Sequence, residues 1–177
     1  STPLTTDGSL ILYTWNDAEG KKAFWHSTSH VMAQVLEEMF PGIQLTLGPA
    51  IANGFYYDVD FGDQKITEAD FKAIESRILE ISKEKHEFKM RAVTKAEALE
   101  TYKDNVYKTE LISNLEDGTI TFCDHATFTD LCRGGHIPNT SIIKAVKIMS
   151  VAGAYWRGDE KNKQLTRVYG TSFPKQK

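Results

Sequence analysis

Residues 26–40 read HSTSHVMAQVLEEMF, and residues 55–61 read FYYDVDF. In the first stretch Val31, Val35 and Met39 recur every four residues, which predicts a helix over residues 26–40 that ends before Pro41-Gly42. In the second stretch large apolar side chains occupy every other position, which predicts a half-buried strand. A helix followed by a strand with one apolar face favours a mixed fold.

The surrounding sequence supports the same class. Thr67 precedes an apolar stripe, which predicts a capped helix over residues 67–85. Thr94 and Glu97 have capping-box spacing and predict a shorter helix, and another helix is expected within 104–114. Further strands are expected at residues 9–15, 43–47, 119–123, 127–132, 144–151 and 164–169. The sequence therefore predicts an α+β fold, with an antiparallel sheet packed against helices.

Composition excludes several classes of protein. The 177 residues are 41% hydrophobic and 25% charged, which is unlike a disordered, collagen-like or coiled-coil chain. No run approaches the ~20 apolar residues of a membrane span, and the N-terminus does not resemble a signal peptide. Two cysteines exclude a disulfide framework and favour a reduced, cytoplasmic protein. The absence of an initiator Met favours a piece of a longer protein.

Charge is distributed unevenly along the chain. The net charge is −3, but residues 144–177 contain eight Lys or Arg and only two acids, Asp159 and Glu160. Such a basic segment on an acidic body suits a surface that contacts phosphate, and it equally suits a solvated face.

Histidine and cysteine residues form the main candidate site. His26 and His30 are four residues apart and share one helix face, while Cys132 and His136 have the same spacing a hundred residues later. Three imidazole nitrogens and one thiolate make a tetrahedral zinc set if the two pairs meet in space. An ordinary helix pair and an unrelated loop pair would have the same spacing, so the pattern alone leaves both interpretations open.

Residues near these pairs are weaker candidates. Gly134 and Gly135 allow a positive φ and close approach of a ligand to the backbone, as would a plain turn. Asp130 can orient an imidazole or bind a polar ligand, and Lys108 carries no signal by itself. Cys123 and His125 alternate at a strand end, where a packed thiol and a surface imidazole are expected.

Several longer motifs closely resemble the editing region of threonyl-tRNA synthetases. These are HSTSH at 26–30, LGPAIANGFYYD at 47–58, DLCRGGHIPN at 130–139, AGAYWRGD at 152–159 and RVYGT at 167–171. Alanyl-tRNA synthetases and freestanding alanyl editing proteins share the histidine and cysteine motifs but not, in general, AGAYWRGD. The resemblance covers nearly all of the chain from about residue 20. It implies the α+β fold of the second additional, or editing, domain of these synthetases.

The resemblance implies hydrolysis of serine attached by mistake to threonine tRNA. A pocket made for threonine cannot exclude the smaller serine, because one methyl group gives only about 10- to 200-fold discrimination. By resemblance the catalytic residues are His26, His30, Lys108, Asp130, Cys132 and His136, and the substrate-binding residues are Tyr57, Gly134 and Gly135. In this reading His26 activates water, Lys108 supports the terminal ribose or the developing charge, and Asp130 holds the serine amine or hydroxyl.

The resemblance also implies the surroundings of this domain. Residues 1–20 would be the tail of a truncated TGS domain and residues 21–177 the editing domain. The full-length synthetase would be a cytoplasmic homodimer. Its catalytic core, which uses ATP and binds its own zinc, would lie outside this chain. Partners would be the acceptor end of threonine tRNA carrying serine and the rest of the synthetase, with no membrane. Proline usually precedes the last histidine of the motif, where this chain has Gly135.

The sequence is compatible with a site that binds zinc and with one that does not, and with a catalytic or a non-catalytic domain. In alanyl relatives the quartet His26, His30, Cys132 and His136 would bind zinc, whereas bacterial threonyl domains work without it. We expect no required cofactor in this domain. A non-catalytic module that binds the tRNA acceptor stem through a structural zinc site is the main alternative, followed by a freestanding editing protein. A general metallohydrolase is disfavoured because the chain has no His-Glu-x-x-His motif.

Overall fold

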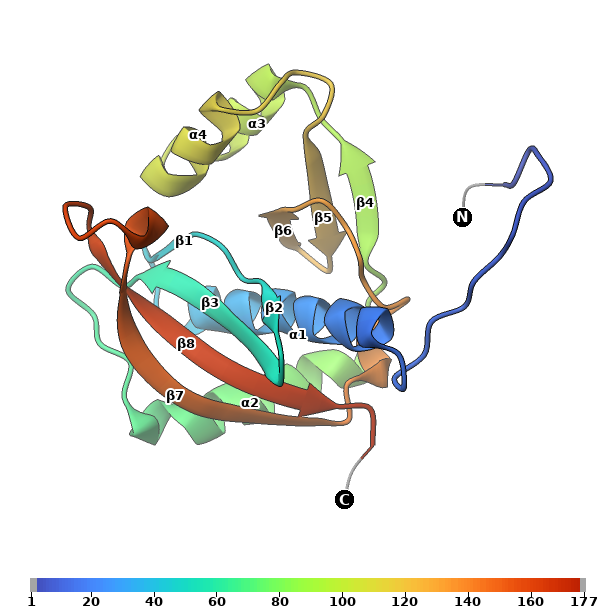
Figure 1. The fold of residues 1–177 in the computed structure, drawn as a ribbon. Helices are drawn as coiled ribbons and strands as arrows, with labels where there is room; N and C mark the ends of the chain where they lie inside the picture. Colours follow the sequence, from blue (N-terminus) through green and yellow to red (C-terminus); the bar gives the residue numbers. More distant parts are fainter. Residues whose placement is uncertain (1–2, 176–177) are drawn as a thin grey trace.

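The computed structural model describes residues 3–175 as two antiparallel sheets with four α-helices (Figure 1). The elements, in chain order, are α1 (Ala18–Met39), β1 (Gln44–Leu45), β2 (Ala50–Ile51), β3 (Gly54–Asp60), α2 (Glu68–Lys83), β4 (Lys89–Ala92), α3 (Lys95–Thr101), α4 (Val106–Ser113), β5 (Thr121–His125), β6 (Phe128–Leu131), β7 (Ala145–Tyr155) and β8 (Gln164–Phe173), with short 3-10 turns at Thr140–Ile142 and Trp156–Gly158. The predicted α+β class is confirmed. Within the described residues no helix has the length and apolar character that crossing a membrane would require.

Helix α1 forms the centre of the molecule and carries the first histidine pair (Figure 1). Its apolar face, from Phe24 to Leu36, is buried against strands β2 and β3 and helix α2. The Trp25 indole N–H donates to the Ser172 carbonyl oxygen at 3.0 Å, which ties α1 to the last strand. The helix begins eight residues before the predicted start. Asp17 to Gly20 have the composition of a turn, but burial of Phe24 and Trp25 extends the helix through them.

The larger sheet has the order β1-β3-β8-β7, with β2 paired to the start of β3. Strand β3 pairs with β8 so that Tyr57 lies opposite Val168. The apolar face of β3 is buried as the alternation predicted, with Phe55, Tyr57 and Val59 in the main core beneath α1. Helices α1 and α2 both pack on this sheet, α2 chiefly against β7.

Helix α2 follows directly from its sequence. Thr67 and Asp70 form a reciprocal capping box that satisfies backbone N–H groups at the first turn. Ile74, Ile78 and Ile81 form the buried stripe on the side facing the sheet. The predicted helix over residues 67–85 is confirmed within two residues at its C-terminus.

The smaller sheet, β4-β5-β6, forms a second layer with α3 and α4 (Figure 1). It has its own core, in which Phe122, Ile112 and Ile120 are fully buried. Strand β4 was absent from the prediction, because all four of its residues are exposed and show no alternation. Tyr107 of α4 packs edge-to-face on Trp156 beside β8, so the two layers also meet at one end.

The predicted strand over residues 9–15 is wrong. The structure gives this segment no helix or strand, and Leu10, Ile11 and Leu12 are each more than 60% exposed. A strand requires a partner for its backbone hydrogen bonds, and none of the segments within residues 3–175 pairs with it. The predicted domain boundary at residue 20 stays a prediction, although α1 already begins at Ala18.

Candidate functional site

A cleft of about 960 Å³ lies between the two layers. One wall comes from α1, the segment before β3 and strands β3 and β8. The other wall comes from α4, β5, β6 and the loop after β6. His26 and His30 project from α1 into this cleft, and Cys132 lines it from the loop after β6. The two motifs that are a hundred residues apart in sequence therefore meet in space.

The four ligand-type side chains converge on one point. One ring nitrogen or sulfur from each of His26, His30, Cys132 and His136 lies within 4.8 Å of all the others. The Nε2 atoms of His30 and His136 are 3.0 Å apart, and the Cys132 sulfur is 3.5 Å from His136 Nε2. Of the two interpretations that the spacing left open, the structure has the one in which the two residue pairs meet.

Each of the outward-facing Nδ1 atoms has a partner, which fixes the orientation of its ring. The His26 Nδ1–H donates to the Gly135 carbonyl oxygen at 3.3 Å, so the lone pair of the neutral ring is on Nε2. His30 Nδ1 forms an ion pair of 3.0 Å with the Asp130 carboxylate. Since the Nδ1 atoms are occupied in this way, the Nε2 atoms face the centre of the cluster.

The ring of His136 is held by stacking as well as by a hydrogen bond. It stacks on Phe88 with an interplanar angle of 9° and on His26 with an angle of 26°. Its Nδ1 lies 3.7 Å from the sulfur of Cys123, which is buried beneath it in strand β5. Stacking on both sides leaves this imidazole little rotational freedom.

Burial and charge give the histidines different protonation states. Burial, together with the neighbouring His30 and His136, lowers the pKa of His26 to about 4, so His26 is neutral near pH 7. Burial also acts to lower the pKa of His30, but its contacts with Asp130 and Cys132 outweigh this effect and raise it to about 9. The adjacent Cys123 thiol, with His136 and His30, holds the pKa of Cys132 well below its ordinary value, against the effect of burial. The cluster thus combines a neutral imidazole, an imidazolium and a thiolate.

Asp130 is the hub of a buried polar network. Asp130 is 3% exposed, and its carboxylate accepts a hydrogen bond from the Tyr57 hydroxyl at 2.8 Å. The same carboxylate forms ion pairs with Lys108 and with His30. Although burial opposes it, the Lys108 ammonium and His30 hold the pKa of Asp130 below its usual range. Tyr57 and Lys108 were both predicted to be site residues. They lie next to the cluster, under Asp130, and both are almost fully buried.

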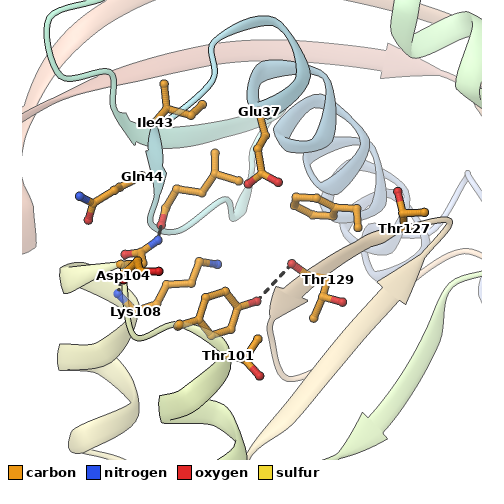
Figure 2. Close-up of a pocket in the computed structure, with 13 residues that line it drawn as sticks. Glu37, Ile43, Gln44, Thr101, Asp104, Lys108, Thr127 and Thr129 are labelled. Carbon is orange, nitrogen blue, oxygen red and sulfur yellow. Dashed lines mark hydrogen bonds between the residues drawn. The ribbon is translucent and has the colours of Figure 1, made fainter.

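Lys108 borders a second, smaller pocket of about 450 Å³ on the other side of Asp130 (Figure 2). The Glu37 carboxylate and the Lys108 side chain both point into this pocket. Several other polar groups that line it already bond within the protein, such as Asn105 with the Leu45 carbonyl oxygen and Tyr102 with the Thr129 carbonyl oxygen. The larger cleft, which contains the unpaired Nε2 atom of His26, is therefore the stronger candidate site.

The glycine pair gives the loop its shape. Gly134 and Gly135 have φ angles of 111° and 82°, which side-chain-bearing residues rarely adopt. Proline, whose ring fixes φ near −65°, cannot take the conformation of Gly135. The glycine at this position is thus required by the conformation that presents its carbonyl oxygen to His26.

The residues between the two α1 histidines attach the helix to its surroundings. Ser27 accepts a hydrogen bond from the Ile137 backbone N–H at 2.9 Å, which fixes the loop after His136. The Ser29 hydroxyl lies 2.7 Å from the Gly48 carbonyl oxygen and donates to it. The Thr28 and Ser172 hydroxyls share a hydrogen bond of 2.7 Å. These small polar residues connect α1 to three separate segments.

Sequence reasoning was incomplete for Cys123 and wrong for His125. Cys123 is packed as expected, but its contact with His136 depends on the pairing of β5 with β6, which the local sequence does not indicate. His125 is buried rather than exposed, with Nε2 2.8 Å from the Gln34 side-chain oxygen. The β5–β6 turn folds against α1 and covers this imidazole, which the local alternation could not indicate.

The donor set fits a zinc ion. Zinc bound tetrahedrally by nitrogen at ~2.0 Å and sulfur at ~2.3 Å would hold ligand atoms about 3.3 to 3.6 Å apart. The observed separations of 3.0 and 3.5 Å are close to this geometry, and the wider separations, of up to 4.8 Å, would have to shorten around the ion. Zinc-binding histidines also usually bond through their second nitrogen to a carboxylate or a carbonyl oxygen, as His30 and His26 do here.

We expect zinc to raise the thermal unfolding midpoint of the metal-free protein. A ligand at a hundred times its dissociation constant stabilises a native state by about 2.7 kcal/mol. The Cys132→Ser variant should lose most of this shift, whereas the His86→Gln variant, altered outside the cluster, should retain it. Equal shifts in both variants, measured by differential scanning calorimetry, would contradict zinc binding at this cluster.

Comparison with known proteins finds similarity to aminoacyl-tRNA synthetases. Residues 120–169 match the family model described as the threonyl and alanyl tRNA synthetase second additional domain. The chain is 90% identical over 176 residues to a threonine--tRNA ligase of Flavobacterium johnsoniae, which covers 99% of the chain and 27% of that protein. It is 89% identical to the threonine--tRNA ligase of Flavobacterium psychrophilum over 177 residues, with 100% of the chain and 27% of the relative covered. For the threonine--tRNA ligase of Parabacteroides distasonis the identity is 59% over 179 residues, with 100% of the chain and 28% of the relative covered.

The chain thus spans about 27% of the length of the curated relatives that it matches. The matched domain contains β5, β6, the Cys132–His136 loop and β7, and ends within β8. The other half of the cluster, on α1, lies outside that match but inside the alignment with the ligases.

Proposed function

We propose that this chain edits mischarged tRNA, because residues 120–169 match the second additional domain of threonyl and alanyl tRNA synthetases and the chain aligns along its whole length with part of the threonine--tRNA ligases. The proposed reaction is hydrolysis of the ester that joins serine to the terminal ribose of threonine tRNA. Water adds to the ester carbonyl carbon, and the bond between that carbon and the ribose oxygen breaks. The products are serine and tRNA with a free hydroxyl group.

One observation carries this proposal. Three imidazoles and a thiol, from His26, His30, His136 and Cys132, converge at one end of a cleft that is large enough for a nucleoside. Ester hydrolysis needs a base for the attacking water and positive charge near the developing oxyanion. His26 and His30 supply these two groups side by side, with ring centroids 4.7 Å apart.

His26 is the proposed general base. Its Nδ1–H is held by the Gly135 carbonyl oxygen, so Nε2 is the atom that accepts a proton from water. Its pKa of about 4 keeps this atom unprotonated near pH 7. The proton can then pass from Nε2 to the leaving ribose oxygen, which returns the imidazole to its starting state.

The buried network beneath the cluster has a positioning role in this proposal. Asp130 orients His30 and maintains its positive charge, which stabilises the oxyanion. Both oxygens of Asp130 contact protein groups, so we assign it to His30 rather than to the serine amine. Lys108 and Tyr57 hold Asp130 from below, and Lys108 is too buried to reach the ribose.

The chemistry of a metal would be compatible with the same residues. A zinc ion held by His30, Cys132 and His136 would keep its fourth position for water, would lower the pKa of that water and would polarise the ester carbonyl, while His26 Nε2 stays free as the base. We also infer that the segment serves a threonine--tRNA ligase that uses ATP. The rest of that chain and tRNA are then its partners.

The His26→Ala variant tests the assignment of the base. We expect serine release from seryl-tRNA to fall by about 10²- to 10⁴-fold, since this is the usual contribution of a positioned base. His86→Ala, outside the cleft, should leave the rate unchanged. Serine release by His26→Ala at the wild-type rate would contradict the assignment. Binding of the tRNA end by the wild type without any turnover would instead favour a non-catalytic acceptor-stem module.

A further inference from the structure

Four lysine and arginine side chains line the cleft, and they are not equivalent. Arg157 pairs with the Glu110 carboxylate at 3.1 Å. Arg167 makes two hydrogen bonds to Asp58, of 2.8 and 2.9 Å, and its guanidinium lies 3.9 Å from the centre of the Tyr56 ring. The charge of each of these two arginines is already balanced by an acid, so neither is well placed to bind an anionic ligand.

The other two cations, Lys22 and Arg133, have no such balance. Both side chains are exposed in the cleft, and across residues 3–175 neither of them forms an ion pair with a carboxylate. Such side chains can take up an anion without first breaking an existing contact.

Their positions relative to the cluster are informative. Lys22 lies one helical turn before His26 on the same face of α1. Arg133 follows Cys132 directly in the loop that brings the second pair of ligand-type residues to the cluster. Two unbalanced cations from two different segments therefore line the same cleft as the reacting centre.

The substrate class of the proposed function has an anion at the matching place. An ester on the terminal ribose is separated from the 5′ phosphate of the same nucleotide by a single sugar ring, a span comparable to one helical turn. Leu47, Pro49, Leu111 and Leu115 also line the cleft and give it an apolar part that suits a base. Lysine and arginine form short, charge-assisted hydrogen bonds with phosphate oxygens.

We propose that Lys22 and Arg133 form the binding site for the 5′ phosphate of the terminal nucleotide. This inference rests on the proposed function, because it assumes that the ligand is the esterified end of a nucleic acid. The site places the ester by holding the phosphate on the far side of the ribose. It contributes to binding rather than to the chemical step.

The test uses two non-hydrolysable analogues, 3′-seryl-amido-adenosine with and without a 5′ phosphate. Titration calorimetry at low salt should show that the phosphate tightens binding to the wild-type protein about tenfold. The double variant Lys22→Gln/Arg133→Gln should bind both analogues equally well. The Lys72→Gln variant, which alters an exposed lysine on α2 outside the cleft, should retain the tenfold difference.

Two results would overturn the phosphate site. One is equal affinity of the wild-type protein for the two analogues, and the other is a full phosphate effect in the double variant. Both measurements use ligands that cannot be hydrolysed, so they do not depend on turnover. Failure of the proposed editing reaction would appear separately, as an absence of serine release from the true ester.

Discussion

Replacing Asp130 with alanine is expected to lower the free energy of unfolding by about 3–5 kcal/mol, the usual cost of removing one partner from a buried ion pair. The carboxylate is 3% exposed, and it neutralises the equally buried Lys108 and the positively charged His30. Without it, the buried Lys108 ammonium has lost its ion pair, and His30 keeps only the Cys132 sulfur as a counter-charge. Urea unfolding followed by circular dichroism measures the loss.

A double-mutant cycle separates this charge effect from lost packing. The Lys108→Met change removes the buried ammonium but keeps the side-chain volume. We expect the Asp130→Ala/Lys108→Met protein to be more stable than Asp130→Ala alone, since the uncompensated ammonium is gone. Glu80→Ala, which breaks an exposed pair with Arg77, is the control and should cost no more than about 1 kcal/mol. A double variant less stable than either single variant would contradict the account of the network.

Much of the fold was predictable because local signals agreed with the final packing. The capping residues Thr67 and Thr94 begin α2 and α3 at the expected places. The alternation in β3 identified its buried face, on which Tyr57 lies. In each case the side-chain period and the terminating residues pointed to the same element.

The remaining parts depend on contacts between distant segments. Strand β4 exists because it pairs with β5, although its own residues are exposed. The apolar segment 9–15 has strand composition but no partner in the described part of the chain. Composition indicates that a segment can pair, whereas pairing itself requires a second strand.

The candidate site was likewise predictable only in part, because some of its features depend on distant contacts. The spacing of His26 and His30, and of Cys132 and His136, made these residues candidates for one site but left two unrelated pairs equally open. The direction of each ring could not be predicted, because it is set by distant partners such as Gly135 and Asp130. The burial of Lys108 could not be predicted from the sequence either, since lysine is usually exposed. Roles that depend on orientation therefore required the structure.

Discrimination between serine and threonine is the second large effect that we expect. The groups beneath the cluster, Tyr57, Lys108 and Asp130, are joined by hydrogen bonds and ion pairs and cannot move aside easily. The extra methyl group of threonine must then displace packed atoms or stay outside the reactive position. One methyl group changes the rate by about 10- to 200-fold in such a site. We therefore expect serine to be released faster than threonine by a factor in this range.

The most direct measurement compares release of serine and threonine from the same threonine tRNA, at low salt, with and without a chelator. The account predicts rapid loss of serine while threonine stays attached, and the chelator arm determines whether this rate needs metal. Equal release of both amino acids, or no release of serine even at high protein concentration, would contradict the proposed editing function.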